Sequence, residues 1–270
     1  MTAQQPLRGD VAVLVPAAGL GVRLGPGRPK ALRDVAGAPL VAHAVRRVCR
    51  AAGVGCVVVA APPGRADEVH DMVAPETPDH VTLLVVEGGA SRGESVFAAL
   101  SAAPPEYQVV LVHDAARAFA PADLVERVAA AVRDGHDAVI PVLAVVDTVK
   151  EVDPSGHVVR TLDRAVLRAV QTPQGFRREV LLAAHEAAHK AAHKAAHKAD
   201  HGAAGGPNGV TDDAGLVERL GLAVFCVAGA EEALKITGPA DLALAHAHLR
   251  AGAERTLASA KLTSRALDTA

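Results

Sequence analysis

Short, Val-rich apolar runs recur along this 270-residue chain, and they constrain its fold more than any other feature. Each run is continuously apolar and has the length of a strand, as expected for strands that are covered on both faces. Helical patterns lie between the runs, so strand and helix alternate along the sequence. This order predicts an α/β fold with a mostly parallel sheet flanked by helices. The runs span residues 11–16, 54–61, 81–87, 109–114, 137–142 and 222–228.

The helical patterns carry recognisable start and stop signals. One pattern ends on Gly53, one begins with the capping-box pair Ser91 and Glu94, and one opens with Pro121 in its first turn. The alternation is therefore that of a Rossmann-like sheet. In such sheets ligands bind beyond the carboxyl ends of the strands, so the loops there are the places to search for a site.

Composition and charge exclude several classes of protein. The chain has 28 basic and 30 acidic residues, so no global field points to nucleic acid or to a membrane surface. Its longest apolar runs are far shorter than a membrane span, and the N-terminal residues lack an apolar signal core, which predicts a cytoplasmic protein. Three cysteines, Cys49, Cys56 and Cys226, lack metal-binding spacing and are expected to be small core residues in a reducing cytosol.

Three segments depart from the alternation of strand and helix. Residues 144–171 alternate polar and apolar residues around a "DPSG" turn, which predicts a protruding β-hairpin arm. Residues 185–209 hold a His/Lys tetrapeptide repeat and a Gly-rich stretch, which we interpret as a low-complexity insertion that binds no ligand. Residues 251–270 are Ala-rich and are expected to fray. We therefore expect a single domain over residues 1–250, followed by a disordered tail.

The first apolar run is followed by a glycine-rich loop with spaced cations, "AAGLGVRLGPGRPK". The dinucleotide fingerprint fails because Leu24 stands where its third glycine is needed, and the absence of any Gly-Lys pair excludes a Walker loop. What remains is a backbone able to present N–H groups to anionic oxygens, with Arg23 and Lys30 as charged clamps. The alternative is an ordinary tight turn with two solvated cations.

Other strand ends supply complementary groups. Asp114 ends a buried run and could help to hold a divalent cation, although a turn or capping aspartate is the alternative. Gly89 would allow a flat group to approach the backbone, Ser95 could bond a base edge, and Lys235 precedes a predicted helix. The patterns G-x-S-x-G and H-E-x-x-H each occur once, at residues 89–93 and 185–189; the first overlaps the predicted capping box and the second opens the His/Lys repeat. Metal-assisted nucleotide chemistry therefore fits better than a covalent nucleophile.

Taken as a set, the motifs resemble those of the 2-C-methyl-D-erythritol 4-phosphate cytidylyltransferase family over about residues 11–249. The first is shared widely among nucleotidyltransferases, whereas "VHDAAR", "LDR…QTPQ" and "TDDA" narrow the resemblance. In chain order the motifs are "PAAGLGVRLGPGRPKAL", "GGASRGESV", "VLVHDAARAF", "DTVKEV", "TLDRAVLRAVQTPQGF", "VTDDAGLVE" and "ALKITGPADLALA".

The resemblance implies an activity and a set of site residues. The enzyme would transfer CMP from CTP to 2-C-methyl-D-erythritol 4-phosphate in non-mevalonate isoprenoid biosynthesis. It would use Mg²⁺ or another divalent cation near Asp114 and form a homodimer through the arm. The implied catalytic residues, which contact the phosphates of CTP, are Arg23, Lys30 and Lys235. The implied nucleotide-binding residues are Ala17, Ala18, Gly19, Gly89, Ser95 and Ala115. The implied residues of the methylerythritol phosphate site are Arg117, Thr148, Arg164 and Thr211, with Arg164 coming from the second subunit.

Two other functions stay open at this point. One is another polyol-phosphate cytidylyltransferase, such as one that uses ribitol 5-phosphate, because its nucleotide half would look alike. The other is a nucleotide-binding protein without turnover, although Arg23 and Lys30 are both present. The acceptor phosphate is already charged, so the reaction needs no general base. We accordingly expect His113 to be a packing or turn residue.

Overall fold

The structure is a computed structural model that describes residues 9–19, 27–199, 211–238 and 240–244. The strands are β1 (Val11–Pro16), β2 (Asp34–Val35), β3 (Ala38–Pro39), β4 (Val54–Ala61), β5 (Thr82–Glu87), β6 (Val109–Val112), β7 (Ala138–Ala144), β8 (Lys150–Val152), β9 (Val158–Thr161), β10 (Arg168–Val170), β11 (Gln174–Arg177) and β12 (Val224–Ala228). The α-helices are α1 (Leu40–Val48), α2 (Ala66–Val73), α3 (Arg92–Ala102), α4 (Ala122–Arg133), α5 (Arg178–Ala199) and α6 (Asp213–Arg219). No helix in the described part of the chain is long and apolar enough to cross a membrane.

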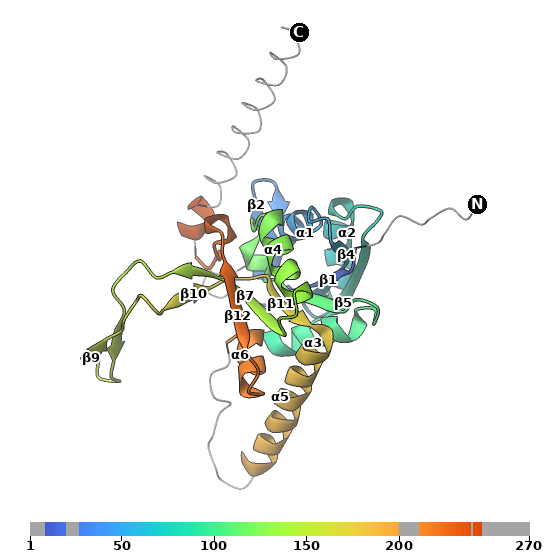
Figure 1. Ribbon diagram of the computed structural model, residues 1–270. Coiled ribbons are helices and arrows are strands. Elements are labelled where there is room, and N and C mark those ends of the chain that lie inside the picture. The colour runs from blue at the N-terminus through green and yellow to red at the C-terminus, as the bar shows by residue number, and fades with distance from the viewer. Residues whose placement is uncertain (1–8, 20–26, 200–210, 239, 245–270) are drawn as a thin grey trace.

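An 8-stranded sheet forms the centre of the molecule (Figure 1). Its strand order is β10-β7-β11-β6-β1-β4-β5, and β12 pairs with β7. Strand β1 is parallel to β4 and β6, and the pairs β4–β5 and β7–β12 are also parallel. The predicted α/β fold with a mostly parallel sheet is therefore confirmed.

The sheet also contains antiparallel strands that the alternation of strand and helix did not predict. Strand β11 is antiparallel to both β6 and β7 and lies between them, and β10 is antiparallel to β7. Gly175 in β11 has a clear reason to be glycine. A Cβ there would lie 2.6 Å from a methyl of Val128 in α4, so only glycine lets the helix pack this closely on the strand.

Helices cover both faces of the sheet, which explains why the central strands are apolar at every position. Along β1, Val11, Val13 and Val15 pack into the core under α1, α2 and α4, whereas Ala12 and Leu14 pack under α3, α5 and α6. Successive side chains of a strand point to opposite faces, so a strand between two helical layers must be apolar throughout. Every residue of β4 is buried for this reason.

The edge strand β12 does not follow this rule. We predicted a strand covered on both faces, but Phe225 and Cys226 are exposed because β12 lies at the edge of the sheet beside β7. The prediction of a buried core position holds for Cys49 and Cys56 and is wrong for Cys226.

The local signals for the helices are largely confirmed. Ser91 is the N-cap of α3, and its hydroxyl accepts a hydrogen bond from the Glu94 backbone N–H at 3.1 Å. Pro121 was expected in the first turn of α4 but is its N-cap, one position earlier. A proline is tolerated there because that N–H needs no partner within the helix.

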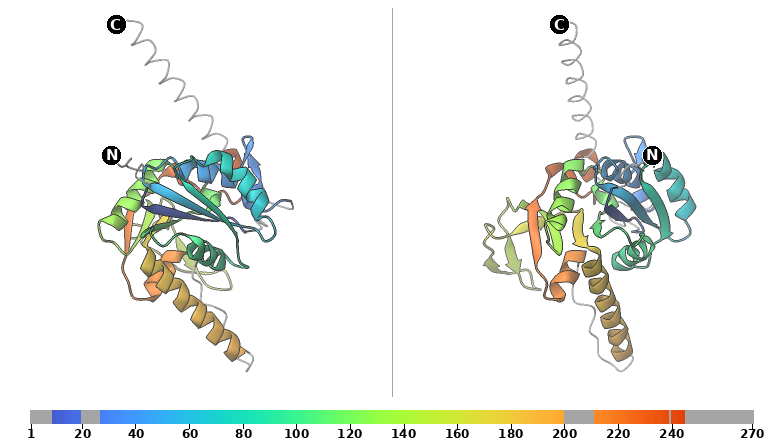
Figure 2. Two further views of the ribbon diagram at one scale, coloured as in Figure 1. Left: turned by 90° about the vertical axis from the view of Figure 1, so that its right-hand side faces the viewer. Right: turned by 45° about the vertical axis from the view of Figure 1, so that its right-hand side comes forward.

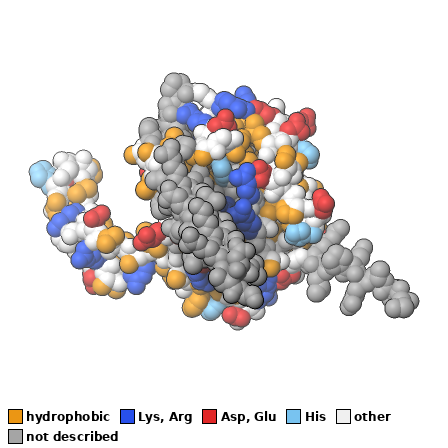
Figure 3. Space-filling model, turned by 90° about the horizontal axis from the view of Figure 1, so that it is seen from above, with side chains coloured by type: hydrophobic (Ala, Val, Ile, Leu, Met, Phe, Trp, Pro, Cys, Tyr) orange, Lys and Arg blue, Asp and Glu red, His pale blue; other side chains and the backbone are white. Residues whose placement is uncertain are grey.

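Residues 144–171 hold the predicted hairpin arm, and its part between β7 and β10 stands apart from the body of the molecule (Figures 1 and 3). Its antiparallel strands β8 and β9 are exposed at every position, and Gly156 at the turn between them has a φ of +89°. Helix α5 also extends beyond the sheet (Figure 2). The predicted His/Lys insertion, about residues 185–209, begins inside α5, and its part over 200–210 lies outside the described residues, as does the tail at 251–270.

Candidate active site

A cavity of about 420 Å³ lies where the loops after several parallel strands meet. Its walls come from the segments that follow β1, β5 and β6 and from the loop after β12. This is the carboxyl edge of the sheet, where the sequence predicted a site. The predicted site residues that line the cavity are Ala17, Ala18, Gly19, Lys30, Gly89, Ser95, Asp114, Ala115 and Lys235.

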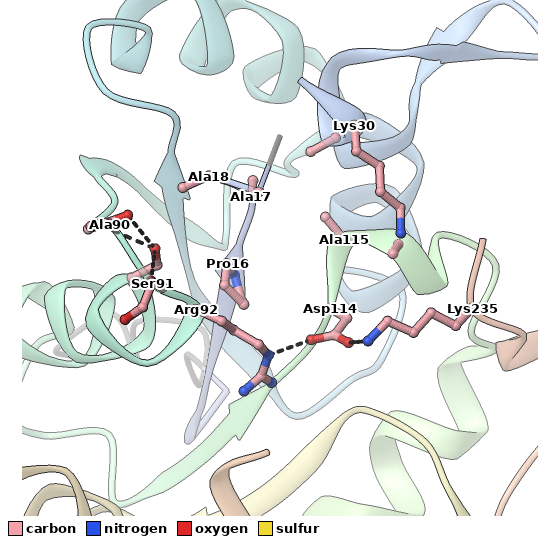
Figure 4. A pocket seen from close by; sticks show the side chains of 15 residues that line it. Pro16, Ala17, Ala18, Lys30, Ala90, Ser91, Arg92, Asp114, Ala115 and Lys235 are labelled. Carbon is pink, nitrogen blue, oxygen red and sulfur yellow. Dashed lines mark hydrogen bonds and ion pairs between the residues drawn. The ribbon is translucent and has the colours of Figure 1, made fainter. Parts of the chain in front are cut away.

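Asp114, two residues beyond the end of β6, is the carboxylate at the centre of this site. Arg92 donates from Nε to its Oδ1 at 3.0 Å, and Lys235 Nζ lies 2.8 Å from its Oδ2, so the two cations approach from opposite sides (Figure 4). Burial disfavours the charged carboxylate, but the charges of Arg92 and Lys235 outweigh this effect and hold the pKa of Asp114 well below its usual value. Asp114 is therefore ionised at neutral pH.

Lys30 enters the cavity from another wall. It begins a short 3-10 helix, Lys30–Leu32, whose Ala31 and Leu32 are buried, so its position is fixed by the core beneath it. Its amine points toward Ala115 (Figure 4). Lys30, Lys235 and Arg92 are thus three cationic side chains in a cavity whose described lining has one carboxylate. That balance favours an anionic ligand such as a phosphate chain.

The loop after β5 is closely packed by the chain itself. A Cβ at Gly88 would lie 2.7 Å from the Cβ of Ala18, and one at Gly89 would lie 2.3 Å from that of Glu94. The hydroxyl of Ser95 is fully buried; it accepts from the Gly89 N–H at 3.2 Å and donates to the Ser91 carbonyl at 2.9 Å. Neighbouring residues of the chain thus lie close to the backbone at these glycines, and their packing fixes the wall of the cavity.

The loop that carries Lys235 is held by two polar side chains. The side-chain oxygen of Gln171 accepts from the Ala230 N–H at 3.0 Å, and its amide donates to the Ala230 carbonyl at 2.8 Å. Arg117 donates to the carbonyls of Ala233 at 2.7 Å and Val170 at 3.0 Å. Both residues therefore tie the Lys235 loop to the end of the arm.

Arg117 was predicted to line the acceptor site, and this role stays a prediction. It is absent from the cavity wall, and its Nη1 and Nη2 groups are engaged with backbone carbonyls. Thr148 and Arg164 are exposed in the arm and do not line this cavity, and Thr211 is exposed just before α6. Arg23 lies outside the described residues.

His113 is fully buried, as expected for a packing residue. Its Nδ1 lies 3.3 Å from the hydroxyl of Thr172, which accepts a hydrogen bond from the Asp114 N–H at 3.0 Å. Burial lowers the pKa of His113 to about 4, so the ring is neutral at physiological pH. It supports the backbone of Asp114 from behind.

Sequence reasoning missed several residues that shape the site. Arg92 lies inside the motif "GGASRGESV" but received no role, and Asp213 lies inside "VTDDAGLVE". Arg92 donates from Nη1 to Asp213 Oδ2 at 2.7 Å, and His185, the first histidine of the repeat, bonds the other oxygen of Asp213 at 3.0 Å. Gln171 was missed in the same way. A polar residue next to a recognised motif is a weak signal by itself, because its partner is distant in the sequence.

The residues of the cavity also bear on whether it can hold a divalent cation. Of the residues that line it, Asp114 is the one carboxylate, and the described part of the chain contains no cluster of three or more His, Cys, Asp or Glu that could hold a metal ion. Mg²⁺ is typically held by one or two carboxylates together with substrate phosphates. One ionised carboxylate in a cavity lined by cationic side chains fits an ion that arrives with a nucleotide.

Comparison with known proteins agrees with this geometry. Residues 11–251 match the family model for 2-C-methyl-D-erythritol 4-phosphate cytidylyltransferase. The enzyme of that name from Streptomyces coelicolor is 49% identical over 245 residues, covering 88% of this chain and 84% of the relative. The one from Frankia casuarinae is 51% identical over 239 residues, covering 88% and 81%.

Solved structures give the same result. One is the crystal structure of 2-C-methyl-D-erythritol 4-phosphate cytidylyltransferase from Thermus thermophilus, whose sequence is 36% identical. The match covers 88% of this chain and 98% of the Thermus chain, with a TM-score of 0.67. The 4-diphosphocytidyl-2C-methyl-D-erythritol synthase from Anaerococcus prevotii is 27% identical, covers 89% and 98%, and has a TM-score of 0.72. A cavity with one carboxylate among three cations, on this sheet and with these relatives, makes the chain a nucleotidyltransferase and a member of the 2-C-methyl-D-erythritol 4-phosphate cytidylyltransferase family.

Proposed function

We propose that this chain transfers CMP from CTP to 2-C-methyl-D-erythritol 4-phosphate and releases pyrophosphate, a step of isoprenoid precursor biosynthesis. The observation that carries the proposal is the cavity in which Arg92 and Lys235 flank Asp114, the one carboxylate among the described residues that line it, and which Lys30 enters from another wall. The family and the curated relatives support the identity of both substrates.

The chemistry needs no base. An oxygen of the acceptor phosphate attacks the α-phosphorus of CTP, a new P–O bond forms, and the bond to the oxygen bridging the α- and β-phosphorus atoms breaks, so pyrophosphate leaves with that electron pair. The nucleophile is already anionic at neutral pH. The barrier therefore comes from repulsion between anions and from charge that develops at the α-phosphate.

The residues of the cavity can lower both contributions to this barrier. In the proposal Lys30, with Arg23, binds the triphosphate, and Lys235 stabilises the charge at the α-phosphate. Lys235 Nζ lies 2.8 Å from Asp114 Oδ2, and this ion pair directs the amine into the cavity. Ala17, Ala18, Gly19, Gly89, Ser95 and Ala115 form the surface for the nucleotide.

Asp114 is the residue that would hold Mg²⁺ in this proposal. The ion would neutralise charge on the phosphate oxygens of CTP. The part of this chain is to keep Asp114 ionised and oriented, through Arg92 on Oδ1 and Thr172 on its backbone N–H.

The acceptor side is proposed to be completed by a second copy of the chain. Thr148 and Arg164 lie in the arm, and Val146, Val159 and Val166 expose 83%, 60% and 76% of their surface there. Apolar side chains without a partner in their own protomer favour an arm that packs on another subunit. We therefore propose a homodimer in which Arg164 and Thr148 of one arm reach the acceptor site of the other subunit, with Thr211 beside them and Arg117 supporting the site through the Lys235 loop.

The proposed location is the cytoplasm, where cysteines such as Cys49 and Cys56 stay reduced.

The test is pyrophosphate release from CTP and Mg²⁺ with three reactions run in parallel: 2-C-methyl-D-erythritol 4-phosphate, ribitol 5-phosphate, and no acceptor. Release that depends on the methylerythritol substrate is expected. Release with ribitol 5-phosphate alone would keep the nucleotide site and reject the proposed acceptor. Absence of turnover with both, from folded protein that binds CTP, would favour a non-catalytic nucleotide-binding protein.

A further inference from the structure

The first histidine of the His/Lys repeat is built into the protein interior. His185 in α5 is 2% exposed, and its ring stacks against Phe97 of α3, with the centroids 6.1 Å apart and an interplanar angle of 23°. Its Nε2 lies 3.0 Å from Oδ1 of Asp213, which is itself 1% exposed. An ionised carboxylate can only accept hydrogen bonds. The proton of the neutral ring therefore lies on Nε2, which donates a hydrogen bond to Asp213.

From Asp213 the contacts lead directly to the cavity. Its other oxygen, Oδ2, accepts from Arg92 Nη1 at 2.7 Å, and Arg92 Nε donates to Asp114 at 3.0 Å. Asp114 then meets Lys235. A continuous polar chain thus runs from the buried pair His185 and Asp213 through Arg92 and Asp114 to Lys235, which is partly exposed at the cavity.

The geometry of Arg92 depends on Asp213 having a second donor. A guanidinium prefers to give two parallel hydrogen bonds to a single carboxylate. Here it divides its donors between Asp213 and Asp114, while His185 bonds the other oxygen of Asp213. Without His185, Oδ1 of Asp213 is buried without a donor, and rotation of that carboxylate toward Arg92 would withdraw Nε from Asp114.

We propose that His185 and Asp213 are positioning residues for nucleotidyl transfer, which hold Arg92 so that it orients Asp114 beside Lys235. The inference rests on the proposed function for its kinetic consequence. It also gives α5 a role at the active site, because the helix that carries the His/Lys repeat is attached to the catalytic wall by the first histidine of that repeat.

The kinetic test compares His185→Leu, which removes the donor, with His185→Gln, whose side-chain amide can replace the Nε2–H. His189→Leu is the matched control, since His189 lies one turn later on α5 and also packs on Phe97, with the ring centroids 4.7 Å apart, but bonds no carboxylate among the described residues. We expect His185→Leu to lower kcat about tenfold with KM for CTP within about twofold, because the lost orientation matters at the reacting phosphate. His185→Gln and His189→Leu should stay within about twofold of the parent enzyme.

A double-mutant cycle then tests the route of the effect. If His185 acts through Asp213, then His185→Leu should add little to the loss of kcat in Asp213→Asn. Additive losses, or an equal loss in His189→Leu, would assign the effect to helix packing and overturn the proposal. If His185→Leu does not fold, His185→Asn takes its place, because its shorter amide does not reach Asp213, and the contrast between Asn and Gln decides.

A spectroscopic measurement separates this inference from the proposed function. The Nε–H resonance of Arg92, assigned by its loss in Arg92→Lys, should shift in His185→Leu and stay unchanged in His189→Leu, whether or not the enzyme turns over. An unchanged resonance in His185→Leu would refute the positioning role. A shifted resonance in an enzyme that is inactive with both polyol phosphates would reject the proposed function and leave the polar chain in place.

Discussion

The wall of the cavity and the arm use the same kinds of side chain in opposite ways. In the wall, Arg92 bridges Asp114 and Asp213, which expose 10% and 1% of their side chains. In the arm, the ion pair between Glu151 and Arg160 leaves 45% and 67% of those side chains exposed. Apolar residues follow the same division, since β4 is buried at every position and β9 at none.

This difference shows which region is complete within one chain. Breaking a buried ion pair by removing one partner typically costs about 3–5 kcal/mol, whereas an exposed pair contributes about 0–1 kcal/mol. The wall is therefore fixed by its own contacts. The arm gains little from its internal contacts, which fits the proposed packing of its exposed valines on another subunit.

The largest loss of activity should come from removing a cation, either in the cavity wall or in the arm. Lys30→Ala in the wall and Arg164→Ala in the arm should each lower turnover about 10²–10³-fold, because each removes a charge at the reacting phosphates. The measurement is pyrophosphate release. The matched control is Lys190→Ala, which removes an exposed cation of α5.

Mixing these two inactive variants separates the roles of wall and arm. If the arm serves the other subunit, random exchange restores about a quarter of the parent activity, since half of the dimers are mixed and half of their sites are intact. Mixtures without any recovery after subunit exchange would show that each arm serves its own protomer, or none.

Substitutions in the core and in the arm should differ in their effect on the free energy of unfolding. Leu111 in β6 is fully buried, and Leu111→Ala should lower the free energy of unfolding by about 2–5 kcal/mol, because it leaves a cavity between the sheet and its helices. Val159→Ala in the arm, where the side chain is 60% exposed, should change it by less than about 0.5 kcal/mol in a monomer. Denaturant titration measures both, and equal losses would mean that the arm belongs to the folding core.

Acid should affect the wall through Asp213. Burial disfavours its charged form, but the hydrogen bond from His185 and the charge of Arg92 hold the pKa of Asp213 below its usual value. Its contribution to stability is therefore full above the unfolded pKa of about 3.9 and is lost as the pH falls through the lower folded pKa. Urea titrations from pH 6 down to pH 3 should show a steeper loss for the parent than for Asp213→Asn; parallel curves would contradict the role of this carboxylate.

The smallest effect concerns the cysteines, and it needs no mutation. Burial raises the pKa of Cys49 to about 12 and that of Cys56 to about 11, which makes both thiols inert in the folded protein. Cys226 is exposed on β12. A thiol reagent at pH 8 should thus modify about one cysteine per native chain and three after denaturation. Rapid modification of all three in the native protein would contradict the two-layered core.

Features that depend on neighbouring residues could be predicted from the sequence alone. The runs at 11–16 and 54–61 became β1 and β4 with the predicted bounds, and Ser91 became the N-cap of α3. The "DPSG" turn and the alternation around it predicted the arm. The loops that follow the predicted strands also brought Lys30, Asp114 and Lys235 to one cavity, because the carboxyl ends of parallel strands share one edge of a sheet.

Features that join distant segments arise only in the folded protein. Strand β11 is short and carries no periodic signal, yet it enters the sheet between β6 and β7, where its Gly175 lets α4 pack closely. Cys226 is exposed because β12 is an edge strand, which its apolar sequence does not reveal. Arg92 and Asp213 are 121 positions apart, so their ion pair exists only after the chain has folded. Local patterns set strands, caps and turns, whereas the polar contacts that orient Asp114 require segments that meet only in the packed protein.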